Sequence, residues 1–157
     1  MKNEKLKNNM KKTFVFMVVI FFVIFCKSQN YDDGRSMSPI LENTIKIMEY
    51  VEGEGAEIVR VEMDILHDEK VTYRILQEGW TYWILAYGDY RVSDIDIEVY
   101  KETSSGWSRI KKDNSADPTA LVEIKPYVSG NYAIKVKGYR YHTGYNSCHY
   151  GLIICHE

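Results

Sequence analysis

The sequence predicts an all-β fold, an antiparallel β-sandwich of about eight strands in a jelly-roll-like arrangement, with one short helix before the strands. Beyond residue 55, apolar residues recur at every second position in short segments. Gly, Pro, Asn and Asp separate these segments at regular intervals, and only one segment of the chain has a helical period. Short alternating segments between turn residues are typical of antiparallel sandwiches and do not fit repeated βαβ units.

The N-terminus has the pattern of an export signal. Five of the first 12 residues are lysines, and an unbroken apolar run of 12 residues follows at 14–25. This run is shorter than the roughly 20 residues of a membrane-spanning helix and matches the ~7–15-residue core of a signal peptide. Cys26 and Ser28 supply small residues for cleavage after Ser28. We therefore predict a signal peptide at residues 1–28 and a secreted or periplasmic protein, with an uncleaved anchor as the alternative.

Lipid anchoring through Cys26 is disfavoured, because Phe25 is large where that processing needs a small residue. The remaining chain is acidic. Six of the 20 basic and one of the 22 acidic residues lie in 1–28, which leaves 14 and 21 and a net charge of −7. An acidic domain lacks the cationic clusters that bind nucleic acid or anionic membranes. After signal cleavage we expect no integral membrane span, and 129 residues suit one domain.

One helix is predicted, at residues 38–52, after a flexible polar lead-in at 29–37. Ser38 is a suitable N-cap and Pro39 fits the first helical position. Glu42 lies near the positive end of the helix dipole. The apolar face is expected to contain Ile40, Leu41, Ile45, Ile47, Met48 and Val51.

The strands of the sandwich domain, which extends to residue 157, follow in order. Residues 59–65 and 71–75 alternate as half-buried strands, with Val59, Val61, Met63 and Ile65 on the apolar face of the first and Val71, Tyr73 and Ile75 on that of the second. Residues 80–87 are apolar on both faces, which predicts a central strand. Ile95, Ile97 and Val99 share one face of the next strand. Shorter strands are expected at 107–111, 119–125, 131–137 and 148–155.

Two cysteines, Cys148 and Cys155, lie in the last predicted strand. Seven residues apart on one extended strand, they lie roughly 23 Å apart and on opposite faces. A disulfide needs Cα atoms within about 7 Å. We therefore expect two separate buried thiols, and a bridge only if the chain folds back between them.

A series of short motifs occurs in order along the predicted strands. The motifs are Leu76-x-x-Gly79-x-x-Tyr82, Gly88-Asp89, Asp94-x-Asp96-x-x-Val99-Tyr100, Asp113, Val122-Glu123-Ile124-x-Pro126 and Gly130-x-Tyr132-x-x-x-Val136. This series resembles the bacterial pre-peptidase C-terminal (PPC) domain family over roughly residues 56–157. The resemblance implies a jelly-roll-like sandwich, usually attached to secreted enzymes; some members bind polymers such as collagen, and some bind calcium. We expect a stand-alone module here.

The Gly130-x-Tyr132 motif also has a direct physical reading. Gly130 permits a tight turn, and Tyr132 can bury its ring while its hydroxyl bonds the preceding turn, as in a tyrosine corner. Gly79 is expected to serve the turn before Trp80 and Tyr82 in a similar way.

The acidic residues around the fourth strand form the first candidate site. Asp89, Asp94, Asp96 and Asp113, with Asp117 nearby, could surround a calcium ion, which takes six to eight oxygen ligands. The alternative is structural: Asp89 and Asp94 cap a turn, while Asp96 and Glu98 line a solvated sheet face. We expect no cofactor other than this calcium ion.

The segment 138–147 is the second candidate site. Tyr139, Arg140, Tyr141, Tyr145 and Asn146 have the composition of a loop that recognises another surface. The same tyrosines could instead pack onto the end of the sandwich as a lid.

The resulting hypothesis is an exported, non-catalytic binding or accessory module that binds an extracellular or envelope polymer or protein through residues 138–147. No nucleophile motif or phosphate-binding loop is present. The terminal Cys-His pairs lie on one strand, which is a poor arrangement for zinc. The alternatives are a calcium-stabilised envelope component and a hydrolase that uses Asp94 or Asp96.

Overall fold

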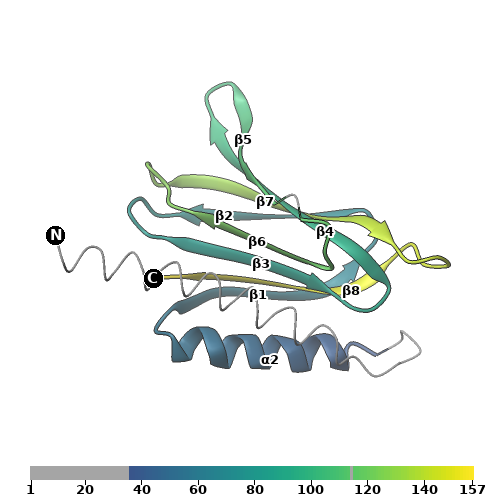
Figure 1. Ribbon diagram of the computed structural model, residues 1–157. Coiled ribbons are helices and arrows are strands. Elements are labelled where there is room, and N and C mark those ends of the chain that lie inside the picture. Colours follow the sequence, from purple (N-terminus) through teal and green to yellow (C-terminus); the bar gives the residue numbers. More distant parts are fainter. Residues whose placement is uncertain (1–35, 114) are drawn as a thin grey trace. The chain divides into compact units, whose positions relative to one another are not determined.

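The computed structural model describes residues 36–113 and 115–157 as one helix and eight strands (Figure 1). The predicted signal peptide and most of the lead-in lie outside the described residues. The elements are α2 (Ser38–Gly53), β1 (Glu57–Leu66), β2 (Glu69–Leu76), β3 (Tyr82–Gly88), β4 (Val92–Thr103), β5 (Gly106–Lys112), β6 (Thr119–Ile124), β7 (Gly130–Tyr141) and β8 (Cys148–His156).

The strands form two four-stranded sheets, which confirms the predicted antiparallel sandwich. One sheet has the order β1-β8-β3-β6 and the other β2-β7-β4-β5, and every paired neighbour is antiparallel. The two layers are visible in Figure 1, with α2 beneath the β1 and β8 side. The short connection between β1 and β2 therefore passes from one sheet to the other, and β5 and β6 end the two sheets at the opposite edge.

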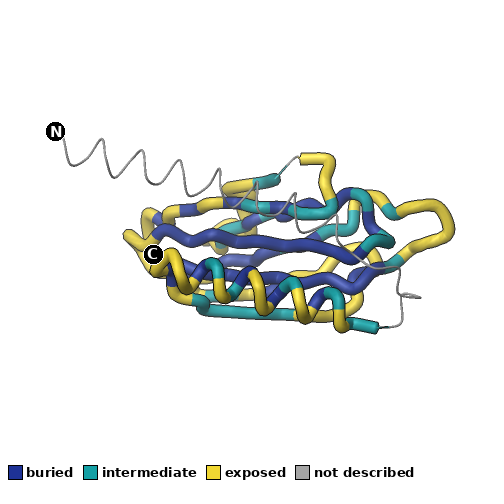
Figure 2. The backbone as a smooth tube through the Cα atoms, turned by 60° about the horizontal axis from the view of Figure 1, so that its bottom comes forward, coloured by how far each residue is buried: buried dark blue, intermediate teal, exposed yellow. Residues whose placement is uncertain are grey.

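The core lies between the sheets and contains the alternating apolar side chains of the inner strands. Ile95, Ile97 and Val99 point into it from β4, as predicted. β3 lies between β8 and β6, which confirms its predicted central position. Figure 2 shows the buried backbone concentrated along these inner strands.

The apolar face of β2 lies on the opposite side from the one expected. Tyr73 and Ile75 are 64% and 62% exposed, whereas their neighbours Thr72 and Leu76 are buried. Polar side chains join the two strands across this edge of the sandwich. Thr72 donates to both carboxylate oxygens of Glu62 at 2.7 and 2.8 Å, and Lys70 pairs with Asp64 at 2.6 Å. The prediction that Val71, Tyr73 and Ile75 form a buried face is wrong, because paired polar groups close this edge. On β1, Val59 packs against the core as expected, whereas Met63 and Ile65 are exposed.

The helix packs against β1 and β8 on the outside of the first sheet. Its buried residues are Ile40, Thr44, Ile47 and Val51, while Leu41 and Ile45 of the expected apolar face are exposed. Ser38 is the first helical residue instead of the cap, which is Met37 without a side-chain bond. No helix in residues 36–113 and 115–157 is long and apolar enough to cross a membrane.

Candidate functional site

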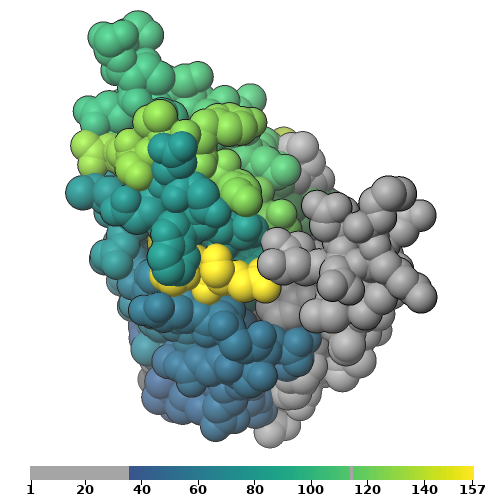
Figure 3. Space-filling view, turned by 90° about the vertical axis from the view of Figure 1, so that its left-hand side faces the viewer, coloured from purple at the N-terminus to yellow at the C-terminus, as the bar shows by residue number. Residues whose placement is uncertain are grey.

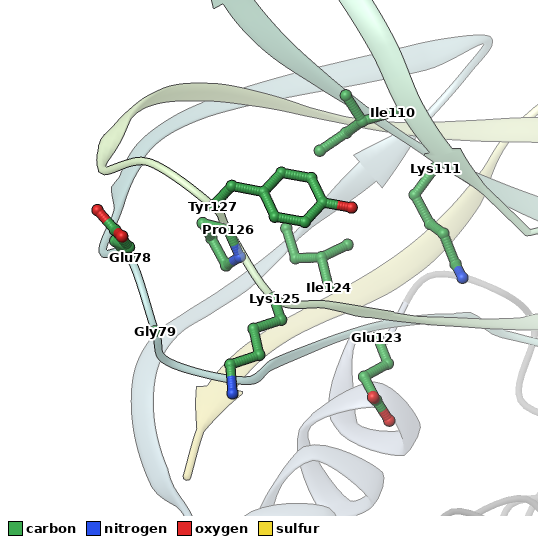
Figure 4. Close-up of a pocket in the computed structure, with 9 residues that line it drawn as sticks. All are labelled: Glu78, Gly79, Ile110, Lys111, Glu123, Ile124, Lys125, Pro126 and Tyr127. Atoms are coloured by element: carbon green, nitrogen blue, oxygen red, sulfur yellow. The ribbon is translucent and has the colours of Figure 1, made fainter.

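A groove lies between β5 and β6, the strands that end the two sheets. Its volume is about 590 Å³. Figure 4 shows apolar side chains at its centre and charged ones at its margin. We call this hollow the β5–β6 groove. It is lined by Glu78, Gly79, Ile110, Lys111, Glu123, Ile124, Lys125, Pro126 and Tyr127.

The apolar centre of the groove contains Ile110, Ile124, Pro126 and Tyr127. Ile124 and Pro126 are buried and give a fixed floor. Ile110 is half exposed, and Tyr127 is 93% exposed. An exposed tyrosine beside a buried apolar floor is a frequent contact residue in protein interfaces, because its ring gives a large contact area with few rotatable bonds.

One wall of the groove is built from two turns that are tied together. Gly79, at φ +84°, allows the β2–β3 turn. The amide of Gly79 donates to the main-chain oxygen of Pro126 at 3.3 Å, and the amide of Glu78 donates to the hydroxyl of Ser129 at 2.9 Å. Figure 3 shows these two turns, in teal and light green, side by side at this end of the sandwich. The predicted role of Gly79 in this turn is confirmed.

The charges at the margin are of both signs. Lys111 and Lys125 face Glu78 and Glu123 around the groove (Figure 4). The indole of Trp83 donates to the carboxylate of Glu123 at 3.2 Å, which anchors that acid. The groove therefore offers an apolar centre with balanced charges at its edge.

The backbone of β6 adds a further binding element. β6 pairs with β3 on one side only, and in the described part of the chain it ends its sheet. Such an edge strand presents a row of N–H and C=O groups that can pair with another chain.

The five residues predicted at 138–147 do not form one loop. β7 continues to Tyr141, so Tyr139, Arg140 and Tyr141 lie on a strand. Tyr139 is exposed, and its ring lies 5.6 Å from the ammonium of Lys137. Arg140 pairs with Asp94 at 3.2 Å.

Tyr141 is held by the fold. Its hydroxyl donates to the carbonyl oxygens of Leu66 and His67, and burial raises its pKa. In the short turn that follows, the ring of Tyr145 contacts Tyr90 at 5.7 Å, and Asn146 is exposed. Tyr141 therefore packs against the fold, whereas Tyr139 faces solvent, and binding through this segment stays a prediction.

The predicted calcium ligands are held mainly by cationic side chains. Asp89 accepts three bonds from the guanidinium of Arg91 and one from the amide of His149. Asp96 pairs with Lys112 at 3.0 Å. Asp89, Asp94 and Asp96 are all buried, so the expectation of a solvated face at Asp96 is wrong.

Asp113 lies in the following turn, where it accepts bonds from the amide and hydroxyl of Ser115. Oδ1 of Asp94 is buried without a hydrogen-bond partner. Among residues 36–113 and 115–157, no three His, Cys, Asp or Glu side chains are grouped to hold one metal ion. Calcium binding stays a prediction.

Cys148 and Cys155 are free and buried, as expected. The Sγ of Cys148 lies in the core, while that of Cys155 donates to the main-chain oxygen of Trp83 at 3.8 Å. Burial raises the pKa of both thiols to about 12.

The β5–β6 groove was missed in the sequence because its lining comes from three separate segments. The motif Val122-Glu123-Ile124-x-Pro126 marks a strand end and a turn. Nothing in it shows that β5, more than ten residues earlier, lies opposite. Tyr127 was the one residue that could have indicated the groove from the sequence. It follows a turn proline directly and lies outside the alternating pattern of core residues, so its large aromatic side chain is not explained by the core.

Comparison with known proteins gives only distant likenesses. No family model matches the chain, and no curated protein sequence matches it. Membership of the PPC family therefore stays a prediction.

Several solved structures are similar at low identity. The periplasmic inhibitor of g-type lysozyme PliG from Aeromonas hydrophila aligns with a TM-score of 0.44 and 15% identity, over 66% of this chain and 90% of that chain. The pre-peptidase C-terminal domain of a Bacillus anthracis collagenase has a TM-score of 0.41 and 16% identity, over 60% and 87%. The Yersinia pseudotuberculosis-derived mitogen has a TM-score of 0.41 and 15% identity, over 60% and 82%. Likenesses at this level say nothing about a ligand or a partner.

Proposed function

We propose that this protein is an exported, non-catalytic binding module that holds an extended segment of a partner protein in the β5–β6 groove. The observation that carries the proposal is the groove itself. An apolar hollow of about 590 Å³ lies directly beside the unpaired edge of β6. An extended peptide can use both features at once.

The edge of β6 supplies main-chain hydrogen bonds. In strand addition, these bonds give affinity, and pockets for alternate side chains give specificity. Lys125 and Pro126 at the end of β6 are residues that discourage indiscriminate pairing along a sheet edge. The pairing is therefore confined to Thr119–Ile124, next to the hollow.

The hollow supplies the specificity. Ile110, Ile124 and Tyr127 offer an apolar contact for one side chain of the peptide. Lys111 and Glu123 flank it with opposite charges. The preferred segment has a large apolar residue with an acidic and a basic residue at neighbouring positions on the same side of the strand.

Selection from a random peptide library displayed on phage tests this function. Peptides enriched on the wild-type protein should share an apolar residue between charged ones. In titrations with a selected peptide, the backbone amides of Thr119–Ile124 and Lys111 should shift in NMR spectra. Tyr127→Ala should weaken binding about tenfold or more, the size expected for an aromatic contact residue.

Tyr139→Ala is the matched control, because Tyr139 is another exposed tyrosine far from the groove. It should leave peptide affinity unchanged. The absence of any enriched peptide, or amide shifts that fall on residues 138–147 instead, would reject the groove as the binding site. The second outcome would favour the tyrosine segment predicted from the sequence.

A further inference from the structure

The outer face of the β2-β7-β4-β5 sheet carries an exposed apolar patch. Val71, Tyr73 and Ile75 project from β2, and Trp107 projects from β5. We call these four residues the β2–β5 patch. Trp107 is 44% exposed, and Tyr73 and Ile75 are exposed by more than half. Contiguous apolar patches on the surface of a folded protein often mark interaction sites.

The two rings of the patch meet across the sheet. The ring centroids of Tyr73 and Trp107 lie 5.5 Å apart at an interplanar angle of 49°. Ala133 on β7 pairs with Tyr73 on one side and with Tyr100 of β4 on the other, and it is buried. Its small side chain leaves room for the rings to approach each other from the flanking strands.

Three acids of this face form ion pairs within it. Glu98 pairs with Arg109 at 2.7 Å, while Glu102 accepts a bond from the uncharged amide of Asn131 at 2.6 Å. Glu69 pairs with Lys135 at 3.1 Å, and Asp96 pairs with Lys112. These ion-paired side chains offer no free charge to attract a strongly charged partner.

A second copy of the chain fits such a face. The chain beyond residue 28 carries a net charge of −7, so two copies repel each other across most surfaces. They repel least on a face where most acids already form ion pairs, as Glu69, Asp96 and Glu98 do here. Aliphatic Val71 and Ile75 beside the rings match the apolar core of a protein interface. The helix α2 packs on the other sheet, and within residues 36–113 and 115–157 no element covers this face (Figure 1).

We propose that two copies of this protein pack their β2-β7-β4-β5 sheets face to face through the β2–β5 patch. Two sheets pack about 10 Å apart with their strands nearly aligned. A two-fold axis parallel to the strands places β2 of one copy over β5 of the other. Tyr73 then meets Trp107 of the second copy, and apolar residues meet apolar residues on both sides.

Sedimentation equilibrium of protein purified from cells that express the full chain tests the dimer. The wild type should dimerise with rising concentration, and Tyr73→Lys should weaken the dimer at least about tenfold, because it places a charge in an apolar contact. Leu41→Lys is the matched control. It introduces the same charge at an apolar residue that is 45% exposed on α2, which packs on the other sheet, and it should leave the dimer intact. Thermal melting should show both variants folded.

A mixing experiment tests the arrangement. Trp107→Glu should also be monomeric, but an equimolar mixture with Tyr73→Lys should form a heterodimer in which the two introduced charges, of opposite sign, lie against each other. A wild type that stays monomeric at every concentration, or a Tyr73→Lys variant that dimerises as well as the wild type, would overturn the proposal. Failure of the mixture to associate would overturn the two-fold arrangement. Binding of a neutral soluble polysaccharide to a monomeric wild type, lost in Tyr73→Lys, would assign the face to a glycan instead.

Discussion

The hydroxyl of Tyr132 donates a hydrogen bond to the main-chain oxygen of Val128, 3.1 Å away, across the turn that joins β6 to β7. The ammonium of Lys101 donates to the same hydroxyl at 3.3 Å and lies 4.9 Å from the ring centroid. The ring of Tyr132 is buried in the core. This turn carries Pro126 and Tyr127, so the tyrosine corner predicted from Gly130-x-Tyr132 also holds the wall of the β5–β6 groove in place.

Replacing Tyr132 with Phe should lower the free energy of unfolding by about 1 kcal/mol, the net contribution of one hydrogen bond. Urea denaturation monitored by circular dichroism measures the change. Tyr127→Phe is the control, because the Tyr127 side chain is almost fully exposed, and it should leave stability unchanged. Equal stability of Tyr132→Phe and the wild type would show that the corner does not stabilise the fold.

Gly138 lies beneath the ring of Tyr141, and a Cβ atom at this position would overlap the Tyr141 phenol. Gly138→Ala should destabilise the protein by about 1–3 kcal/mol, since the ring must shift away from its bonds to Leu66 and His67. Thermal and urea melts measure the effect. A Cβ at Gly53, at the end of α2, meets open space, so Gly53→Ala should be neutral or mildly stabilising. Full stability of Gly138→Ala would show that Tyr141 is free to move, as a binding residue would be.

Asp113 should make the protein less stable as pH rises. Burial raises the pKa of its carboxyl, and the charges of Asp96 and Asp117 raise it further, while bonds from Ser115 oppose the shift. A carboxyl with a raised folded-state pKa contributes stability below its ordinary value of 3.8, and this contribution is lost as pH rises through the folded-state pKa. Asp113→Asn should therefore melt at a higher temperature than the wild type at pH 7, with the difference vanishing in acid.

Calcium binding at Asp113 would reverse the expected order of melting temperatures, so that the wild type with calcium melts above Asp113→Asn. If Asp113 binds calcium, calcium should raise the melting temperature of the wild type, chelator should lower it, and Asp113→Asn should lose this response. A wild type that melts at one temperature with calcium and with chelator would remove the predicted site.

The thiols of Cys148 and Cys155 should be inert in the folded protein. Their burial and pKa values of about 12 leave almost no thiolate at pH 8. If the predicted cleavage after Ser28 occurs, a colorimetric thiol reagent should count no thiols in the native protein and two after denaturation. A count of three would show that Cys26 is retained and that cleavage after Ser28 does not occur, and rapid native labelling would contradict the buried positions.

Several elements could be predicted because their information is local. The alternation of Ile95, Ile97 and Val99 identified the core face of β4, and the apolar run before Gly88 identified a central strand. The acids of β4 were harder to interpret. Their carboxylates look solvated in the sequence, but Arg140 and Lys112 cover Asp94 and Asp96 from neighbouring strands. Contacts between side chains from different strands leave no trace in the local pattern.

The sequence alone determined the class of fold, the positions of the strands and the tyrosine corner, because a period of two and a glycine turn act within a few residues. Only the tertiary structure decided which face of β2 is buried. Alternation shows that Val71, Tyr73 and Ile75 share a face, but the side on which that face lies depends on what packs against it. The groove and the patch were decided in the same way, since each needs strands that the fold alone brings together.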